Sequence, residues 1–226
     1  MARKITKKEI EEPDSFQQAL NKITQYISAN RRTVYTACGV LVLAVVAFTG
    51  WYLYRMNYNE KAGRLYAMAE LASIRTAREG GAYQNNIKMY NDIISQYPGS
   101  KTAALSYYQL GNLYYNLGDM DASIGAYGEF LKDASDTGDL KVLAYNGLGY
   151  CYERKGDFPR ALESFEKAAD SKSSVGFEAT TYSNMARIYD EMKNKEKALE
   201  YYQKALTSAA DPSTQLFLKK MISNIN

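Results

Sequence analysis

The chain repeats one short pattern three times: YYQLGNLY at residues 107–114, YNGLGYCY at 145–152 and YSNMARIY at 182–189. In each copy a glycine or alanine lies between two tyrosines, at the spacing of neighbouring turns on one helix face. A second pattern follows each copy and places a small residue four positions before an aromatic one: Ser123 with Tyr127, Ala161 with Phe165, and Ala198 with Tyr202. The copies begin 38 and 37 residues apart. This period is typical of paired helices in a solenoid, so the predicted fold class is all-α.

Turn residues separate the two helices of each unit. Gly118–Asp119 and Gly156–Asp157 mark this turn in two units, and Lys193–Asn194 marks it in the third. Glycine can end the first helix and the following Asp or Asn can cap the second. We expect the small residues Gly111, Gly149 and Ala186 to lie where the two helices cross, with the aromatic residues filling the space between one pair and the next.

These residues resemble the tetratricopeptide repeat, whose pattern is aromatic-x2-Leu-Gly-x2-Tyr, then Ala-x3-Phe, then Pro, over 34 residues. The resemblance covers residues 67–212, with a faint first unit from about Ala67 in which only the second helix matches. The period here is longer, with the additional residues placed in the loops Ser135–Asp139 and Ser171–Gly176. The family implies a helical solenoid of about four pairs that binds other proteins, and residues 213–226 are predicted to form a capping helix.

Composition argues against several classes of function. The chain has no His, and its two cysteines, Cys38 and Cys151, are isolated from each other. The commonest general base and metal ligand are therefore missing, so we expect no enzyme, no metal site and no cofactor. Residues 55–226 hold 21 Lys or Arg and 21 Asp or Glu, while residues 1–33 hold seven and four. The large domain has no basic excess, which argues against binding to nucleic acid.

Residues 34–54 are 21 residues without a charge. As a helix they would be about 31 Å long, enough to cross the hydrocarbon core of a bilayer. Tyr35 and Trp51 lie near the two ends, as interfacial aromatic residues do. A cleaved signal peptide is the rival interpretation, but the leader of 33 residues is long and the segment ends in bulky residues. We therefore predict an uncleaved transmembrane helix.

The flanking charges bear on orientation. Basic residues next to the segment are balanced on its two sides, and four more at Arg3, Lys4, Lys7 and Lys8 favour a cytoplasmic N-terminus. Residues 1–33 are thus predicted to be a cytoplasmic leader, with disorder up to Pro13 and an amphipathic helix beginning at Asp14 or Ser15. That helix is either a membrane- or partner-docking element or a plain solubilising extension. Residues 55–66 are predicted to be a linking helix that continues from the membrane helix or follows a short break.

In tetratricopeptide repeats the first helices line a concave groove that holds a partner protein. Alignment of the repeats places nine residues of this chain on that groove: Tyr108, Asn112, Tyr115, Asn146, Tyr150, Arg154, Ser183, Arg187 and Asp190. Tyrosine, asparagine and arginine make a wet, adaptable surface for an extended peptide or a partner helix. Tyr108 and Asn112 stand where one variant of the family has a basic clamp for a C-terminal carboxylate, so that clamp is not expected.

The layout of leader, single anchor and repeat domain also resembles the bacterial YfgM-type ancillary subunit of the SecYEG translocon. This resemblance implies a single-pass protein of the bacterial inner membrane with a periplasmic repeat domain. It further implies translocon subunits or periplasmic chaperones as partners. The alternatives are an adaptor for cell-envelope assembly or cell division, and a regulatory subunit of a membrane complex.

Overall fold

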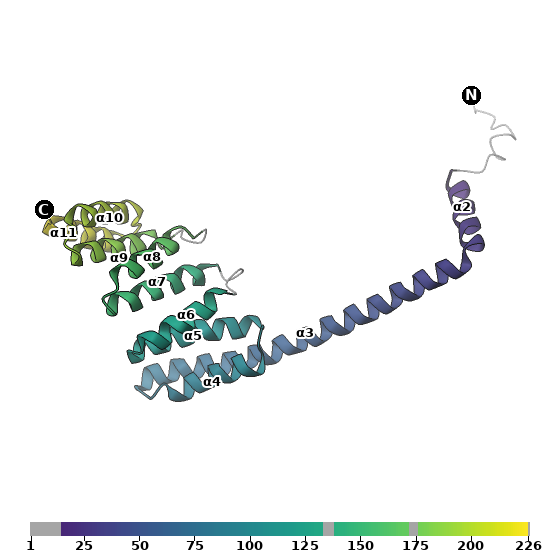
Figure 1. Ribbon diagram of the computed structural model, residues 1–226, viewed down its shortest axis with the longest axis horizontal. Coiled ribbons are helices and arrows are strands. Elements are labelled where there is room, and N and C mark those ends of the chain that lie inside the picture. The colour runs from purple at the N-terminus through teal and green to yellow at the C-terminus, as the bar shows by residue number, and fades with distance from the viewer. Residues whose placement is uncertain (1–14, 133–137, 172–175, 226) are drawn as a thin grey trace, which may run out of the picture. The chain divides into compact units, whose positions relative to one another are not determined.

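The computed structural model describes residues 15–132, 138–171 and 176–225. The described residues form ten helices and no strand (Figure 1). Their bounds are α2 Ser15–Ala29, α3 Arg31–Glu79, α4 Gln84–Gln96, α5 Lys101–Leu117, α6 Met120–Lys132, α7 Asp139–Arg154, α8 Phe158–Ala169, α9 Glu178–Glu191, α10 Lys195–Ser208 and α11 Pro212–Ile225. The predicted leader up to Pro13, a cap at Asp14, and most of the loops Ser135–Asp139 and Ser171–Gly176 lie outside the described residues.

The chain divides into two compact units, Met1–Asn57 and Tyr58–Asn226. The first unit contains α2 and the beginning of α3. Helix α3 is unbroken from Arg31 to Glu79, so the helix after residue 54 continues directly from the apolar segment. Among the described residues, α3 is the one helix that is long and apolar enough to cross a membrane, with an 18-residue window of mean hydropathy 2.0.

The second unit is a stack of antiparallel helix pairs (Figure 1). Helix α5 pairs with α6, α7 with α8, and α9 with α10, and α11 packs on α10. The last part of α3 joins α4 and α5 in a shared core through Ala69, Tyr90 and Leu110. This arrangement confirms the all-α solenoid of about four helix pairs and a final helix.

The pairs α5/α6 and α7/α8 are each held together where an aromatic ring lies directly on a helix backbone. A Cβ built on Gly149 would come within 2.4 Å of the Phe165 ring, and one built on Gly111 would come within 2.6 Å of the Tyr127 ring. The Ser123 hydroxyl donates to the Gly111 carbonyl oxygen at 2.8 Å, so the small residue of the second helix lies at the same crossing. In the last pair Ala186 is completely buried and packs in one core cluster with Tyr202 of α10. The predicted helix crossings are therefore confirmed.

The ring of Tyr127 also joins one pair to the next. Its other edge lies 2.6 Å from the Cβ that would be added to Gly147 on α7. Gly147 therefore packs against Tyr127 of the preceding pair, and Gly149 packs against Phe165 of its own pair.

We expect Gly149→Ala to destabilise the second unit by about 1–3 kcal/mol, because the added methyl group must displace the Phe165 ring. Gly125→Ala is the matched control, since a Cβ at that helical position meets nothing within 4 Å. Alanine there should stabilise by about 0.5–1 kcal/mol. Urea unfolding of residues 58–226 measures both changes. Equal unfolding midpoints for the two variants would show that the Phe165 ring does not pack closely on the backbone at residue 149.

The turns between paired helices share one backbone conformation. Gly118, Gly156 and Lys193 all have positive φ, at 83°, 73° and 60°. The next residue then caps the second helix: Asp157 accepts from the Arg160 N–H at 3.2 Å and Asn194 from the Lys197 N–H at 3.1 Å. Lys193 thus adopts a left-handed conformation that glycine takes without strain.

We expect Lys193→Gly to stabilise the second unit by about 0.5–1 kcal/mol by relieving this conformation. The same substitution at Lys219, an exposed position inside α11, should destabilise by about 1 kcal/mol, because glycine weakens a helix interior. Thermal unfolding of the two variants checks the sign of each change. A lower melting temperature for Lys193→Gly would show that the lysine side chain stabilises this turn.

The first pair departs from the pattern at its crossing. Asn86 takes the position that Ser123, Ala161 and Ala198 take in the later second helices, four residues before Tyr90. Asn86 is buried, and among the described residues its side-chain amide has no hydrogen-bond partner. The second helix of the first pair therefore keeps the aromatic residue of the pattern at Tyr90 but has an amide in place of the small residue.

Candidate functional site

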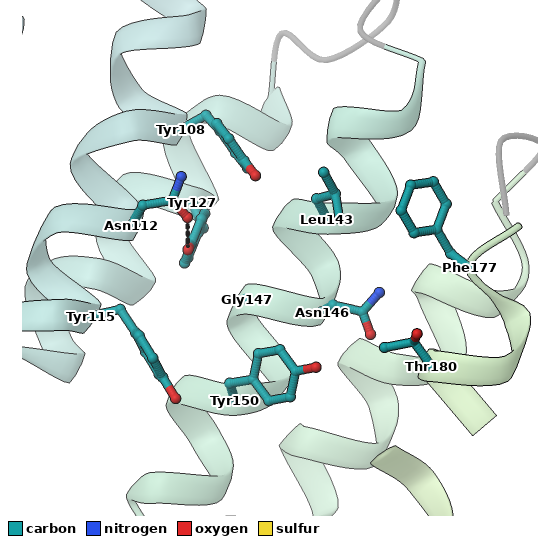
Figure 2. A pocket seen from close by; sticks show the side chains of 10 residues that line it. All are labelled: Tyr108, Asn112, Tyr115, Tyr127, Leu143, Asn146, Gly147, Tyr150, Phe177 and Thr180. Carbon is teal, nitrogen blue, oxygen red and sulfur yellow. Dashed lines mark hydrogen bonds between the residues drawn. The ribbon is translucent and has the colours of Figure 1, made fainter. Parts of the chain in front are cut away.

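A cavity of about 260 Å³ opens between α5, α7 and the beginning of α9 (Figure 2). Its lining consists of Tyr108, Asn112, Tyr115, Tyr127, Leu143, Asn146, Gly147, Tyr150, Phe177 and Thr180. None of these ten side chains carries a charge at neutral pH. The cavity is therefore lined by aromatic rings, hydroxyls and amides.

The structure brings five of the groove residues selected from the sequence to this cavity: Tyr108, Asn112, Tyr115, Asn146 and Tyr150. Figure 2 shows them on α5 and α7, around the same open space. Their role in binding a partner remains a prediction.

The two arginines selected from the sequence do not line the cavity. The Arg154 guanidinium lies over the Tyr115 ring, 5.4 Å from its centroid. Arg187 forms an ion pair with Glu153 and donates to the Asn184 side-chain oxygen at 3.2 Å. Both cations therefore contact neighbouring side chains of the first helices. Ser183 and Asp190 are also absent from the lining.

The tyrosines of the cavity are part of the core as well as of its surface. Tyr108 packs against Tyr127 and Phe130, with ring centroids 6.0 and 5.4 Å apart. The Tyr127 hydroxyl donates to the Asn112 side-chain oxygen at 2.6 Å, the bond drawn in Figure 2. Burial raises the pKa of both Tyr108 and Tyr127. Their hydroxyls therefore stay neutral throughout the physiological pH range.

Asn146 joins two helix pairs. It is buried, and its amide nitrogen donates to the Val142 carbonyl oxygen at 3.1 Å and to the Thr181 hydroxyl at 3.2 Å. Asn184 lies beside them on α9, and its amide nitrogen donates to the Tyr150 hydroxyl at 2.8 Å. These hydrogen bonds connect α7 to α9 beside the cavity. Asn146 therefore has a structural role that the sequence pattern did not indicate.

We expect Asn146→Ala to destabilise the second unit by about 1–3 kcal/mol, because it leaves buried polar groups of α9 without their partner. Asn116→Ala, on an exposed site near the end of α5, should change stability by less than about 0.5 kcal/mol. Denaturant unfolding compares the two. If Asn146→Ala unfolds like Asn116→Ala, the amide does not connect the pairs.

Five lining residues were not selected from the sequence as groove residues: Tyr127, Leu143, Gly147, Phe177 and Thr180. Leu143 lies one turn before Gly147 on α7, while Phe177 and Thr180 lie at the beginning of α9. Phe177 directly follows the loop by which this chain exceeds the usual repeat length, so repeat alignment carries no signal for it. Its place at the cavity follows from the stacking of the pairs.

A second cavity of about 260 Å³ lies between α3, α4 and α5. It is lined by Glu70, Ser73, Ile74, Ala77, Tyr83, Tyr90, Gln109, Asn112, Leu113 and Asn116. Asn112 lines both cavities, so the two are neighbours along the inner face of the stack. Within the second unit, α3 therefore supplies the first inner helix, although its sequence lacks the repeat pattern of the later first helices.

Comparison with known proteins agrees with this geometry. Two family models, both described as tetratricopeptide repeat, match residues 108–175 and 142–211. Residues 108–211 of the chain are tetratricopeptide repeats. The repeats identified by the two models are the pairs α5 to α10, which carry most of the first cavity.

Curated relatives of this repeat protein are distant. Lipopolysaccharide assembly protein B of Escherichia coli K12 is 25% identical over 177 residues, which cover 76% of this chain. The chain spans only 43% of the length of that relative. Photosystem I assembly protein Ycf3 of Prochlorococcus marinus is 34% identical over 83 residues, 37% of this chain and 47% of the relative. The narrower resemblance to the YfgM-type subunit is not confirmed by these matches.

Solved structures share the fold. The MamA fragment from residue 41 to the end, from Desulfovibrio magneticus RS-1, has a TM-score of 0.56 at 19% identity and covers 72% of this chain and 84% of its own. BtubC from P. vanneervenii has a TM-score of 0.58 at 15% identity, covering 75% and 82%. At these identities the likeness concerns the fold alone. Tetratricopeptide repeats are scaffolds for protein–protein interaction, and families of this kind are generally not enzymes.

Proposed function

We propose that this repeat protein is a membrane-anchored scaffold that holds a segment of a partner protein in the cavity between α5, α7 and α9. The observation that carries the proposal is the uncharged lining of tyrosine, asparagine and threonine side chains on the inner face of the stack. Half-buried tyrosines offer large contact area at low entropic cost, and amides can bond to a peptide backbone.

A second cavity on the same face supports a chain segment as the occupant. The neighbouring cavity between α3 and α5 extends the same face. A chain segment that places successive side chains in the two cavities would use both.

Location is the second part of the proposal. The apolar stretch at residues 34–54 would anchor the chain in a bacterial inner membrane, with the basic leader in the cytoplasm and the repeats in the periplasm. The support is the length and hydropathy of α3 together with the excess of basic residues before it.

For the biological setting we favour cell-envelope assembly. The support is the distant relationship to a protein named for lipopolysaccharide assembly. Protein translocation or periplasmic chaperoning is the second candidate, and the layout of leader, anchor and repeats supports it. A role in cell division, or as a regulatory subunit of a membrane complex docked through residues 1–33, is a further alternative.

Binding in the cavity between α5, α7 and α9 can be blocked by a substitution that does not disturb the core. Thr180 is exposed and its side chain lies at the cavity, so Thr180→Arg adds bulk and charge there (Figure 2). Thr207→Arg makes the same substitution on an exposed site of α10 and serves as the control. Alanine at Tyr108 or Tyr150 is less suitable, because both rings pack on buried aromatic residues.

We expect Thr180→Arg to weaken partner binding at least about tenfold, or about 1.4 kcal/mol, without lowering the melting temperature. The tagged full-length protein and both variants would be captured from membranes in mild detergent, and co-purifying proteins quantified by mass spectrometry. The binding proposal requires proteins that are depleted with Thr180→Arg and retained with Thr207→Arg. Equal recovery with all three proteins would place the binding surface outside this cavity.

The identity of the depleted proteins then separates the settings. Envelope-assembly proteins support the favoured setting, while translocon subunits or periplasmic chaperones support the second. Loss of partners on deletion of residues 1–33, with no effect of Thr180→Arg, would indicate a regulatory subunit docked through its leader.

A further inference from the structure

Helix α2 presents one continuous apolar face that no other described residue of the first unit covers. Phe16, Leu20, Ile23 and Ile27 recur at intervals of four, three and four residues. Their exposed fractions are 68%, 44%, 55% and 40%. At 100° per residue these side chains occupy one side of the helix, and the glutamines and Asn21 occupy the other. Four large exposed apolar side chains on one short helix indicate that this face contacts another apolar surface.

The position of α2 in the chain indicates which apolar surface it contacts. The helix ends at Ala29, and the uncharged segment begins five residues later at Val34. Five residues span at most about 18 Å even when fully extended. If residues 34–54 cross a bilayer, α2 is therefore tethered to the membrane surface, and the lipid interface is the apolar phase within its reach.

The edges of the apolar face fit that interface. Tyr26 and Lys22 lie side by side along one border of it, by the same helical geometry. A tyrosine ring and a lysine stem are suited to the boundary between headgroups and acyl chains, because each has an apolar body and a polar end. At 15 residues, about 22 Å, α2 is too short to cross the hydrocarbon core.

We propose that α2 is an interfacial helix, lying in the surface layer of the bilayer with Phe16, Leu20, Ile23 and Ile27 toward the acyl chains. This inference rests on the proposed membrane anchor and goes beyond it, because it assigns the leader a second contact with lipid. The occupant of the apolar face is the bilayer itself, not a partner protein.

The charge of α2 determines which lipids its binding to the bilayer requires. Lys22 is the one charged residue between Ser15 and Ala29. Binding of α2 therefore depends on apolar contact rather than on anionic headgroups, and it persists in bilayers made of zwitterionic lipid alone.

The test uses the full chain in lipid nanodiscs, with Cys38→Ala and Cys151→Ala removing the native thiols. A single spin label is placed at Ile23→Cys on the apolar face or at Gln25→Cys on the polar face. A third label, at Val42→Cys, reports on the anchor. Power saturation compares the access of oxygen, which enters lipid, with that of a water-soluble nickel chelate. The nanodiscs contain either phosphatidylcholine alone or a mixture with phosphatidylglycerol.

We expect the ratio of oxygen to nickel access to be severalfold higher at residue 23 than at residue 25, in both lipid compositions. Equal ratios at 23 and 25, with residue 42 in lipid, would overturn the interfacial helix and leave the anchor intact. Access of nickel at residue 42 would instead overturn the anchor.

Two other outcomes would also contradict the inference. Protection of residue 23 from both reagents would mean that a second copy of the chain covers the face. A difference between residues 23 and 25 seen only with phosphatidylglycerol would mean that charge, not apolar contact, holds the helix.

Discussion

The repeat unit depends on one close contact, in which an aromatic ring packs directly on a helix backbone that has no side chain at that point. Tyr127 packs on Gly111 in this way, and Phe165 packs on Gly149. The contact fixes the distance and register of the two helices, because a Cβ at either glycine would overlap the ring. Since Tyr127 also reaches Gly147, the same ring sets how one pair stacks on the next.

The cavity follows from that stacking. In the alignment of first helices, Gly147 takes the position held by Gln109 in the unit before and by Asn184 in the unit after. Gln109 and Asn184 each bond to a tyrosine hydroxyl, of Tyr66 and Tyr150. Gly147 has no side chain to do this, and the ring of Tyr127 occupies that place instead. The cavity lies beside this ring and is lined on one side by Tyr108 and Tyr115.

Stability and recognition therefore share the same residues. Asn146 lines the cavity and also connects α7 to α9, and the cavity tyrosines pack on buried rings. A surface supported in this way is held rigid, which lowers the entropy lost when a partner binds. Exposed positions at its edge, such as Thr180, are the ones free to vary without loss of the fold.

The sequence alone determined the helix pairs, their turns and the crossings at Gly111 and Gly149, because these depend on spacing within 40 residues and on residue size. It also indicated five of the cavity residues through repeat alignment. Only the tertiary structure decided that α3 supplies an inner helix, that Phe177 and Thr180 reach the cavity, and that Arg154 and Arg187 do not. Those facts depend on how consecutive pairs stack and on which neighbour each side chain meets, and the period of a single repeat carries no information about either.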